Sequence, residues 1–319
     1  MAECNSAIQQ IPNCSVETFL KGRTSACVMS EERKEQLTGI EAVARLAMRV
    51  SQPHLADYGA TTSRHDFTQR QLLSCLIVRA YLKTTYRGLL EFLKISPSLR
   101  RELGLEDKLP HYTTLQKFST RSQVLEIVQI LIARMGSAAV EQSAHPVAAM
   151  DSTGLATTTA SAYFQSRQGK KRRGWAKVSV IVLCGSLLPL ALVVDRGPSN
   201  DRVQAPELLR QGQAAGRVET LYADAGYDAE WIHALCREEW GVESLIKPNG
   251  QRADGRRNGR WRAEMSPEHL KERQFGRRWG VETFFSGLKR MMGAALNART
   301  HAQQLAEAAI KVLAYALHR

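Results

Sequence analysis

The segment that most constrains the fold runs from Val178 to Val194 and is almost entirely apolar (VSVIVLCGSLLPLALVV). Its length is close to that of a membrane-spanning helix. However, a Gly-Ser pair interrupts the segment, its first half is rich in β-branched residues, and an Asp-Arg pair closes it. These features favour two buried strands, 178–183 and 187–194, joined by a tight turn. We therefore expect a sheet at the centre of a globular protein and no membrane partner.

Strand and helix patterns alternate around this strand pair. A strand ends at Asp151, before the pair, and a helix pattern at 203–214 follows it. A strand at 218–222, a helix at 228–239, a strand at 242–247 and two final helices complete the order. This order predicts a mixed sheet with helices on its faces, and it is the element order of the ribonuclease H-like fold.

The charge balance indicates a polyanionic partner. The net charge of +13 favours nucleic acid first and an anionic membrane second. The cationic residues gather in runs with few acidic residues among them, although soluble, flexible loops would explain such runs as well. The runs are Arg167, Lys170, Lys171, Arg172, Arg173 and Lys177; Arg252, Arg256, Arg257, Arg260 and Arg262; and Lys271, Arg273, Arg277 and Arg278.

Three parts of the chain are expected from these patterns. Residues 1–30 are weakly patterned and are expected to be weakly ordered. Residues 31–144 show helical patterns throughout, and residues 145–319 hold the α/β core, with a basic loop at 248–270. The all-α part is expected to bind DNA, because short helices with basic edges permit a helix-turn-helix arrangement. Many unrelated helical domains share this pattern.

Two helix starts in the all-α part have candidate capping residues. Asp66 precedes the apolar positions of one helix, and Thr113 or Thr114 precedes those of another. Short polar side chains at such positions accept a hydrogen bond from the first turn of a helix.

The six cysteines indicate neither a zinc site nor a disulfide framework. None belongs to a CxxC pair, and no histidine cluster accompanies them. A reducing cytoplasm is therefore the expected compartment. The first residues also lack the basic start and apolar core of a secretion signal.

Three carboxylates occupy positions suited to phosphodiester chemistry. Asp151 and Asp224 end the first and fourth predicted strands, and they meet if those strands are neighbours. A later helix can bring Glu282 to the same point. Such chemistry uses two Mg²⁺ ions about 4 Å apart, which prefer oxygen ligands. The two aspartates could instead be turn residues, and Asp195, which also ends a strand, competes with Asp224.

The helix expected at 275–289, FGRRWGVETFFSGLK, carries a mixed face. At about 100° per residue, Phe275, Arg278, Glu282 and Lys289 lie within roughly 60° of one another. A carboxylate between two cations suits a polyanionic substrate, whereas the simpler interpretation is a salt-bridged amphipathic helix. An adjacent apolar stripe would anchor the helix: Val281, Phe284, Phe285, Leu288 and Met292.

The residues of this helix carry a family resemblance. Their spacing resembles the Tyr-x2-Arg-x3-Glu-x6-Lys signature of insertion-sequence transposases of the DDE type, especially the insertion-sequence-five group. The segments MDSTG, GPSNDRVQAPELL and ADAGYD are also similar to that family, in the same order. The resemblance extends from about Thr113 to residue 319. Phe275 replaces the usual Tyr, which removes a hydroxyl contact to DNA.

The resemblance implies roles for the matching residues. Asp151 would be a ligand shared by two Mg²⁺ ions, for which Mn²⁺ can substitute, while Asp224 and Glu282 would each complete one metal site. Arg278 and Lys289 would hold DNA phosphates. Basic residues of the runs would follow the DNA backbone: Lys170, Lys171, Arg172, Arg173, Arg256, Arg257 and Arg260.

The implied reaction cleaves DNA at the terminal inverted repeats of the element and transfers the freed 3′-OH ends into target DNA. A homodimer on DNA, at the nucleoid of a prokaryotic cell, is expected from the same resemblance. Trp175 and Trp261 lie inside the basic runs and either stack on a flipped base or pack under a loop.

Two other functions are compatible with the sequence. The first is a ribonuclease H-like endonuclease without strand transfer, although its need for an all-α recognition domain would be small. The second is a transposase-derived DNA-binding protein that has lost its chemistry, which the three intact carboxylates argue against.

Overall fold

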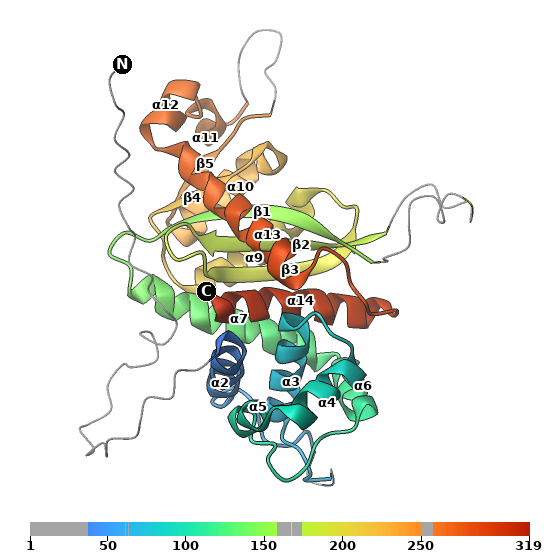
Figure 1. Ribbon diagram of the computed structural model, residues 1–319. Coiled ribbons are helices and arrows are strands. Elements are labelled where there is room, and N and C mark those ends of the chain that lie inside the picture. Colours follow the sequence, from blue (N-terminus) through green and yellow to red (C-terminus); the bar gives the residue numbers. More distant parts are fainter. Residues whose placement is uncertain (1–37, 61, 63, 158–166, 168–173, 250–257) are drawn as a thin grey trace, which may run out of the picture.

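The computed structural model describes residues 38–60, 62, 64–157, 167, 174–249 and 258–319. Its centre is a five-stranded mixed sheet in the order β3-β2-β1-β4-β5, flanked by helices and preceded in the chain by further helices (Figure 1). The expected fold class, an α/β core of ribonuclease H-like element order with N-terminal helices, is therefore confirmed. The strands are β1 (Val147–Ala156), β2 (Trp175–Leu183), β3 (Pro189–Gly197), β4 (Thr220–Ala223) and β5 (Glu243–Ile246).

The helices fall into two groups along the chain. Those before the sheet are α2 (Gly39–Ser51), α3 (Gln69–Tyr81), α4 (Tyr86–Ile95), α5 (Pro97–Glu102), α6 (Tyr112–Ser119) and α7 (Gln123–Glu141). Those after β3 are α9 (Asp201–Ala215), α10 (Glu230–Ala234), α11 (Arg260–Ala263), α12 (Pro267–Glu272), α13 (Trp279–Met292) and α14 (His301–His318). The described residues also form short 3₁₀ turns, η1 (Ala225–Tyr227) and η3 (Phe275–Arg278), and a π-helical turn, η2 (Leu235–Trp240).

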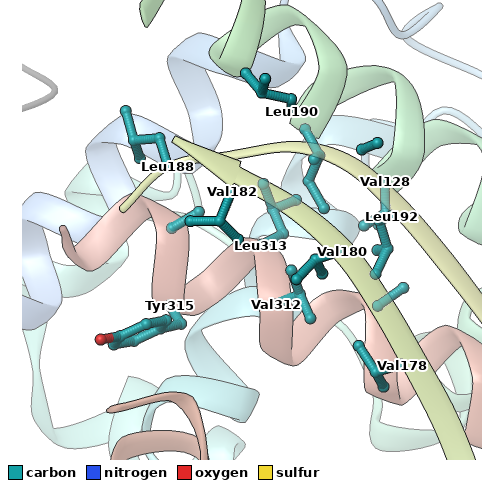
Figure 2. Packing of buried hydrophobic residues seen from close by; sticks show 14 of the residues in the cluster. Val128, Val178, Val180, Val182, Leu188, Leu190, Leu192, Val312, Leu313 and Tyr315 are labelled. Carbon is teal, nitrogen blue, oxygen red and sulfur yellow. The ribbon is translucent and has the colours of Figure 1, made fainter. Parts of the chain in front are cut away.

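The apolar segment forms an antiparallel hairpin, as expected, and helices cover both of its faces. Val178, Val180 and Val182 of β2 pack with Val312 and Leu313 of α14 (Figure 2). On the opposite face of the sheet, β2 and β3 contact α9. Strands buried on both faces have apolar side chains in both directions, which explains why the segment lacks polar alternation.

The parallel part of the sheet sets up the functional edge. β1 pairs with β4 in parallel, with Met150 opposite Ala223, and β4 pairs in parallel with β5. β1 also pairs with β2 in antiparallel orientation, with Asp151 opposite Val180. Directly paired residues point to the same face of a sheet. Asp151 therefore lies on the face that α13 and α14 cover.

Two of the expected helix caps are wrong. Thr68, not Asp66, caps α3: its side chain accepts from the N–H of Gln71, and the Gln71 side chain accepts from the N–H of Thr68. This reciprocal pair satisfies two N–H groups of the first turn at once. α6 begins after His111, whose ring accepts from the N–H of Thr113. Thr113 is therefore already inside the helix.

The N-terminal helices join the sheet through the end of the chain. α14 contacts α2, α3 and α7 as well as β2 and β3. Among the described residues, α7 is the one helix whose length and hydropathy match a membrane span. It packs against the edge strand β3 at Gly136, where a Cβ atom would lie 2.8 Å from the Cα atom of Leu190. α7 is thus a helix docked closely on the sheet.

Candidate active site

Asp151 and Asp224 lie side by side at the ends of the paired part of β1 and β4. Each directly follows the last parallel residue pair, Met150 and Ala223. The competing residue Asp195 lies on β3, which β2 separates from β1. Asp224 also serves as a turn residue, because its Oδ1 atom accepts from the N–H of Gly226 at 2.5 Å. The strand order thus brings together the two aspartates that the sequence singled out.

Asp151 is held in an environment that disfavours its charge. Its side chain is 20 % exposed, and its Oδ1 atom accepts a 2.7 Å hydrogen bond from the N–H of Ser152. Its pKa is raised to about 6, chiefly by burial, with contributions from the carboxylates of Asp224 and Asp201. The Ser152 N–H and the Arg278 guanidinium act in the opposite direction. A cation bound beside Asp151 would offset this cost.

Arg278 links Asp151 to Glu282. Its Nη1 atom lies 3.7 Å from Oδ2 of Asp151, and its Nη2 atom donates to Oε1 of Glu282. Glu282 is 54 % exposed, in the first turn of α13. Arg278 and Glu282 therefore form the i,i+4 salt bridge of the simpler interpretation, and Arg278 also contacts Asp151 on β1 of the sheet. Of the face expected on this segment, Arg278 and Glu282 lie together, and the first turn of the segment is the 3₁₀ turn η3.

Buried side chains hold α13 in this position. The apolar stripe predicted from the sequence is buried: Val281, Phe284, Phe285, Leu288 and Met292. Phe275 packs edge-on against Tyr222 of β4, with ring centroids 6.1 Å apart. Lys289 is half-buried and lies on α13 about two turns beyond Glu282. Phe275 thus has a packing contact that requires no hydroxyl group.

The donor atoms at this site suit a hard divalent cation. Asp151 and Asp224 offer carboxylate oxygens at neighbouring strand ends, and repulsion between them favours a bound positive charge. Within the described ranges, no three Asp, Glu, His or Cys side chains converge closely enough to hold one ion. The guanidinium of Arg278 stands between the Asp151 and Glu282 carboxylates. Two of the three expected ligands are therefore adjacent, and the third is joined to them through Arg278.

A second polar layer lies on the opposite face of β1, and sequence reasoning missed it. The hydroxyl of Ser152 donates to Oδ1 of Asp201 at 2.5 Å, and Nζ of Lys177 lies 2.7 Å from the same oxygen. Lys177 is 5 % exposed and also donates to the carbonyl of Ser199. The available signal was Lys177 within the apolar pattern of β2, together with Asp201 in the segment GPSND. Ser152 joins this layer to Asp151, because its N–H donates to Oδ1 of Asp151 and its hydroxyl donates to Asp201.

The basic runs are less available to DNA than their sequence implies. Lys177 is neutralised by Asp201, Arg262 forms two hydrogen bonds with Asp228, and Arg273 is paired with Glu243. The predicted DNA-contacting residue Arg260 is exposed and stacks on Trp261 at 4.1 Å. The other predicted contacts in these runs lie outside the described residues: Lys170, Lys171, Arg172, Arg173, Arg256 and Arg257.

Both tryptophans of the basic runs pack against the protein. Trp261 lies between the guanidinium groups of Arg237 and Arg260, at 4.6 and 4.1 Å from its ring centre. Trp175 is 39 % exposed and covers Gly197, where no Cβ atom would fit beside the indole ring. Each ring thus has a packing contact within the protein.

Comparison with known proteins places this site in a family. No curated protein gives a significant match to the sequence. A family model described as the transposase DDE domain matches residues 142–317, from just before β1 to the last turn of α14. That match includes Asp151, Asp224, Arg278 and Glu282. Because it covers more than half of the chain, the protein belongs to the transposase DDE domain family.

Proposed function

We propose that this protein is the transposase of an insertion sequence of the insertion-sequence-five-like group. The observation that carries the proposal is the adjacency of Asp151 and Asp224 within the transposase domain, with Glu282 joined to Asp151 through Arg278. The reaction would be cleavage at the terminal inverted repeats, followed by transfer of the 3′-OH ends into target DNA. The expected assembly is a homodimer on DNA, at the nucleoid of a prokaryotic cytoplasm.

The carboxylates would be the metal ligands of this reaction. Two Mg²⁺ ions, or Mn²⁺ in their place, would activate the attacking oxygen and stabilise the leaving oxygen. Asp151 would bind both ions, while Asp224 and Glu282 would each complete one metal site. Arg278 would exchange its contact with Glu282 for a DNA phosphate, since a guanidinium binds phosphate with the same fork geometry that binds carboxylate.

The two parts of the chain would have different functions in this reaction. Residues 31–144 are proposed to recognise DNA, and residues 145–319 to perform the chemistry. Lys289 lies on the same helix as Glu282 and would contact the DNA backbone near the cut. Residues 1–30, which were expected to be weakly ordered, and residues 250–257 of the basic loop 248–270 lie outside the described residues.

The test compares wild type with Asp151→Ala on DNA carrying the terminal repeats of the element, with Mg²⁺. Wild type should cut and join, and both activities should disappear in Asp151→Ala. Asp195→Ala is the matched control, because Asp195 is an exposed strand-end aspartate on β3, away from the site. Cleavage that persists in Asp151→Ala refutes the site.

The same assay separates the alternative functions. Cutting without joined products would identify an endonuclease without strand transfer. Binding of the terminal repeats with neither cutting nor joining would identify a DNA-binding protein without chemistry. Glu282→Gln, an exposed substitution that preserves shape, should abolish cutting while the free energy of unfolding stays within about 0.5 kcal/mol of wild type.

A further inference from the structure

A basic cavity lies where the N-terminal helices meet the end of α13. It has a volume of about 190 Å³ and is lined by the end of α3, the segment after α13, and α14. In Figure 1 these three segments come together beside the sheet. We call it the junction pocket, defined by Arg79, Lys83, Gly293, Glu307 and Lys311.

The junction pocket carries excess positive charge. It contains three cations, Arg79, Lys83 and Lys311, against one carboxylate, that of Glu307. Arg79 and Lys311 are 6 % and 4 % exposed, and the Nη2 atom of Arg79 lies 3.9 Å from Oε1 of Glu307. The carboxylate also accepts from the N–H of Ala298 at 2.8 Å. The pocket thus holds one carboxylate and three cations, two of which are buried.

One cation of the pocket, Arg79, is incompletely satisfied by the protein. The buried Nε atom of Arg79 has no hydrogen-bond partner among the described residues, and its guanidinium stacks on Tyr86 at 4.3 Å. Lys311 donates to the carbonyl of Ala295 at 2.6 Å. Lys311 also donates to the carbonyl of Gly293 at 3.4 Å. Burial lowers the pKa of Lys311, the carboxylate of Glu307 acts against this shift, and repulsion from Arg79 and Lys83 adds to it. Buried cations in excess of their partners favour a bound anion.

The pocket reaches solvent at Lys83, the exposed cation of the three. A Cβ atom at Gly293 would lie 3.7 Å from Nζ of Lys311 and 3.9 Å from Cδ of Lys83, so the missing side chain leaves room between the two lysines. Gly293 has φ 82°, which also favours glycine. Lys83 is exposed and has φ 52°, just beyond the end of α3. Lys83 therefore marks the solvent side of the pocket, and the buried cations Arg79 and Lys311 line it as well.

We propose that the junction pocket binds one phosphate group of the DNA backbone. The inference rests on the proposed function, which makes DNA the partner. Arg79 offers a fork of donors, and Lys83 and Lys311 offer point charges, the combination that phosphate recognition uses. This contact would tie the N-terminal helices and the catalytic domain to the same DNA strand.

The position of the pocket predicts which phosphate it binds. Gly293 follows Glu282 by eleven residues, which corresponds to about 16 Å along α13. Lys289 lies between them on the same helix. The proposal takes the axis of the DNA duplex to be parallel to α13, and each strand then advances about 3.4 Å per nucleotide along that axis. The bound phosphate should therefore lie about five nucleotides from the cleaved bond.

The first test measures binding to a duplex with the terminal repeat, without Mg²⁺, over a range of salt concentrations. Lys83→Gln removes an exposed cation of the pocket and is expected to leave folding intact. The slope of log K against log salt should become smaller in magnitude by about 0.9, as for one lost phosphate contact. The matched control is Arg210→Gln, which removes one exposed charge from α9 on the other face of the sheet and should leave the slope unchanged. An unchanged slope in Lys83→Gln overturns the proposal.

The second test locates the phosphate. Ethylation of single phosphates should interfere with wild-type binding at a position about five nucleotides from the cut, and this interference should disappear in Lys83→Gln. Interference that is the same in both proteins overturns the DNA assignment. A free phosphate ion is the alternative ligand. It would be indicated if inorganic phosphate raised the melting temperature of wild type but not of Lys83→Gln, relative to chloride at equal ionic strength, while the interference pattern stayed the same in both proteins. That result also overturns the DNA assignment. Because these measurements omit Mg²⁺, they remain informative if the cleavage test of Asp151 fails.

Discussion

The Nη1 atom of Arg278 lies 3.7 Å from Oδ2 of Asp151, and the same guanidinium donates to Glu282. One cation therefore connects the central strand of the sheet to the helix that covers it. The family resemblance implies a DNA-phosphate contact for Arg278. The structure adds that Arg278 lowers the pKa of Asp151 from within the site. Removing Arg278 should thus change the chemistry of the carboxylates as well as the affinity for DNA.

Arg278→Gln should raise the pKa of Asp151 above its value of about 6, because the favourable interaction with the carboxylate is lost. Carbon NMR of the aspartate carboxyl groups in metal-free protein measures this directly. Arg277→Gln is the control, since Arg277 is exposed and is the neighbouring residue in the chain. The interpretation is wrong if the Asp151 titration is the same in wild type and Arg278→Gln.

Asp151→Asn should stabilise the metal-free protein at neutral pH. The raised pKa means that the folded protein binds a proton on Asp151 more tightly than the unfolded chain does. The free energy of unfolding therefore decreases as pH rises from about 4 to about 6, by at most roughly 3 kcal/mol. Asn cannot ionise and avoids this loss. Urea unfolding with EDTA should show the variant more stable at pH 7 and the difference gone at pH 4.

Asp195→Asn, on the edge strand, should show no such pH-dependent gain and serves as the control. A wild-type protein that is as stable as Asp151→Asn at pH 7 would contradict the environment described for Asp151.

Asp201→Asn should destabilise the protein by about 2–3 kcal/mol, because it leaves the ammonium of Lys177 buried without a carboxylate. Lys177→Met should cost less, since Asp201 is 32 % exposed and can be solvated. The double variant should lose about as much free energy of unfolding as Lys177→Met alone, and less than the sum of the losses in the two single variants. Denaturant unfolding of the four proteins gives this coupling, and strictly additive effects would show that the pair is not coupled.

Arg262→Gln should destabilise the protein by about 3 kcal/mol at pH 7, because Asp228 is 1 % exposed and would lose both of its guanidinium hydrogen bonds. Burial opposes ionisation of Asp228, yet hydrogen bonds from Arg262 and the N–H of Asn249 hold its pKa below the usual value. The stabilisation is present above the unfolded pKa near 3.9 and is lost as pH falls through the lowered folded value.

The difference between wild type and Arg262→Gln should therefore narrow in acid, which unfolding curves at pH 7 and below pH 3 can measure. Arg210→Gln, in an exposed pair with Glu207, should change stability by less than about 0.5 kcal/mol at either pH.

Local patterns in the chain were sufficient for the order of the elements and for the candidate carboxylates. The apolar hairpin of β2 and β3 follows from β-branched residues around a turn, and the buried stripe of α13 follows from helical periodicity. Both depend on neighbours close in sequence. Local patterns were not sufficient to predict the capping residue of α3. Asp66 resembles an N-cap, but Thr68 and Gln71 together satisfy two N–H groups of the first turn.

The sequence by itself determined which side chains could form the site, and only the tertiary structure decided which of them meet. Asp195 and Asp224 both follow predicted strands, and the placement of β4 beside β1 brings Asp224, not Asp195, to Asp151. Charge runs could not reveal that Asp201, Asp228 and Glu243 neutralise cations distant in sequence. Strand neighbours and long-range ion pairs depend on the packing of the whole core, because each contact becomes favourable only when all the surrounding elements are in place.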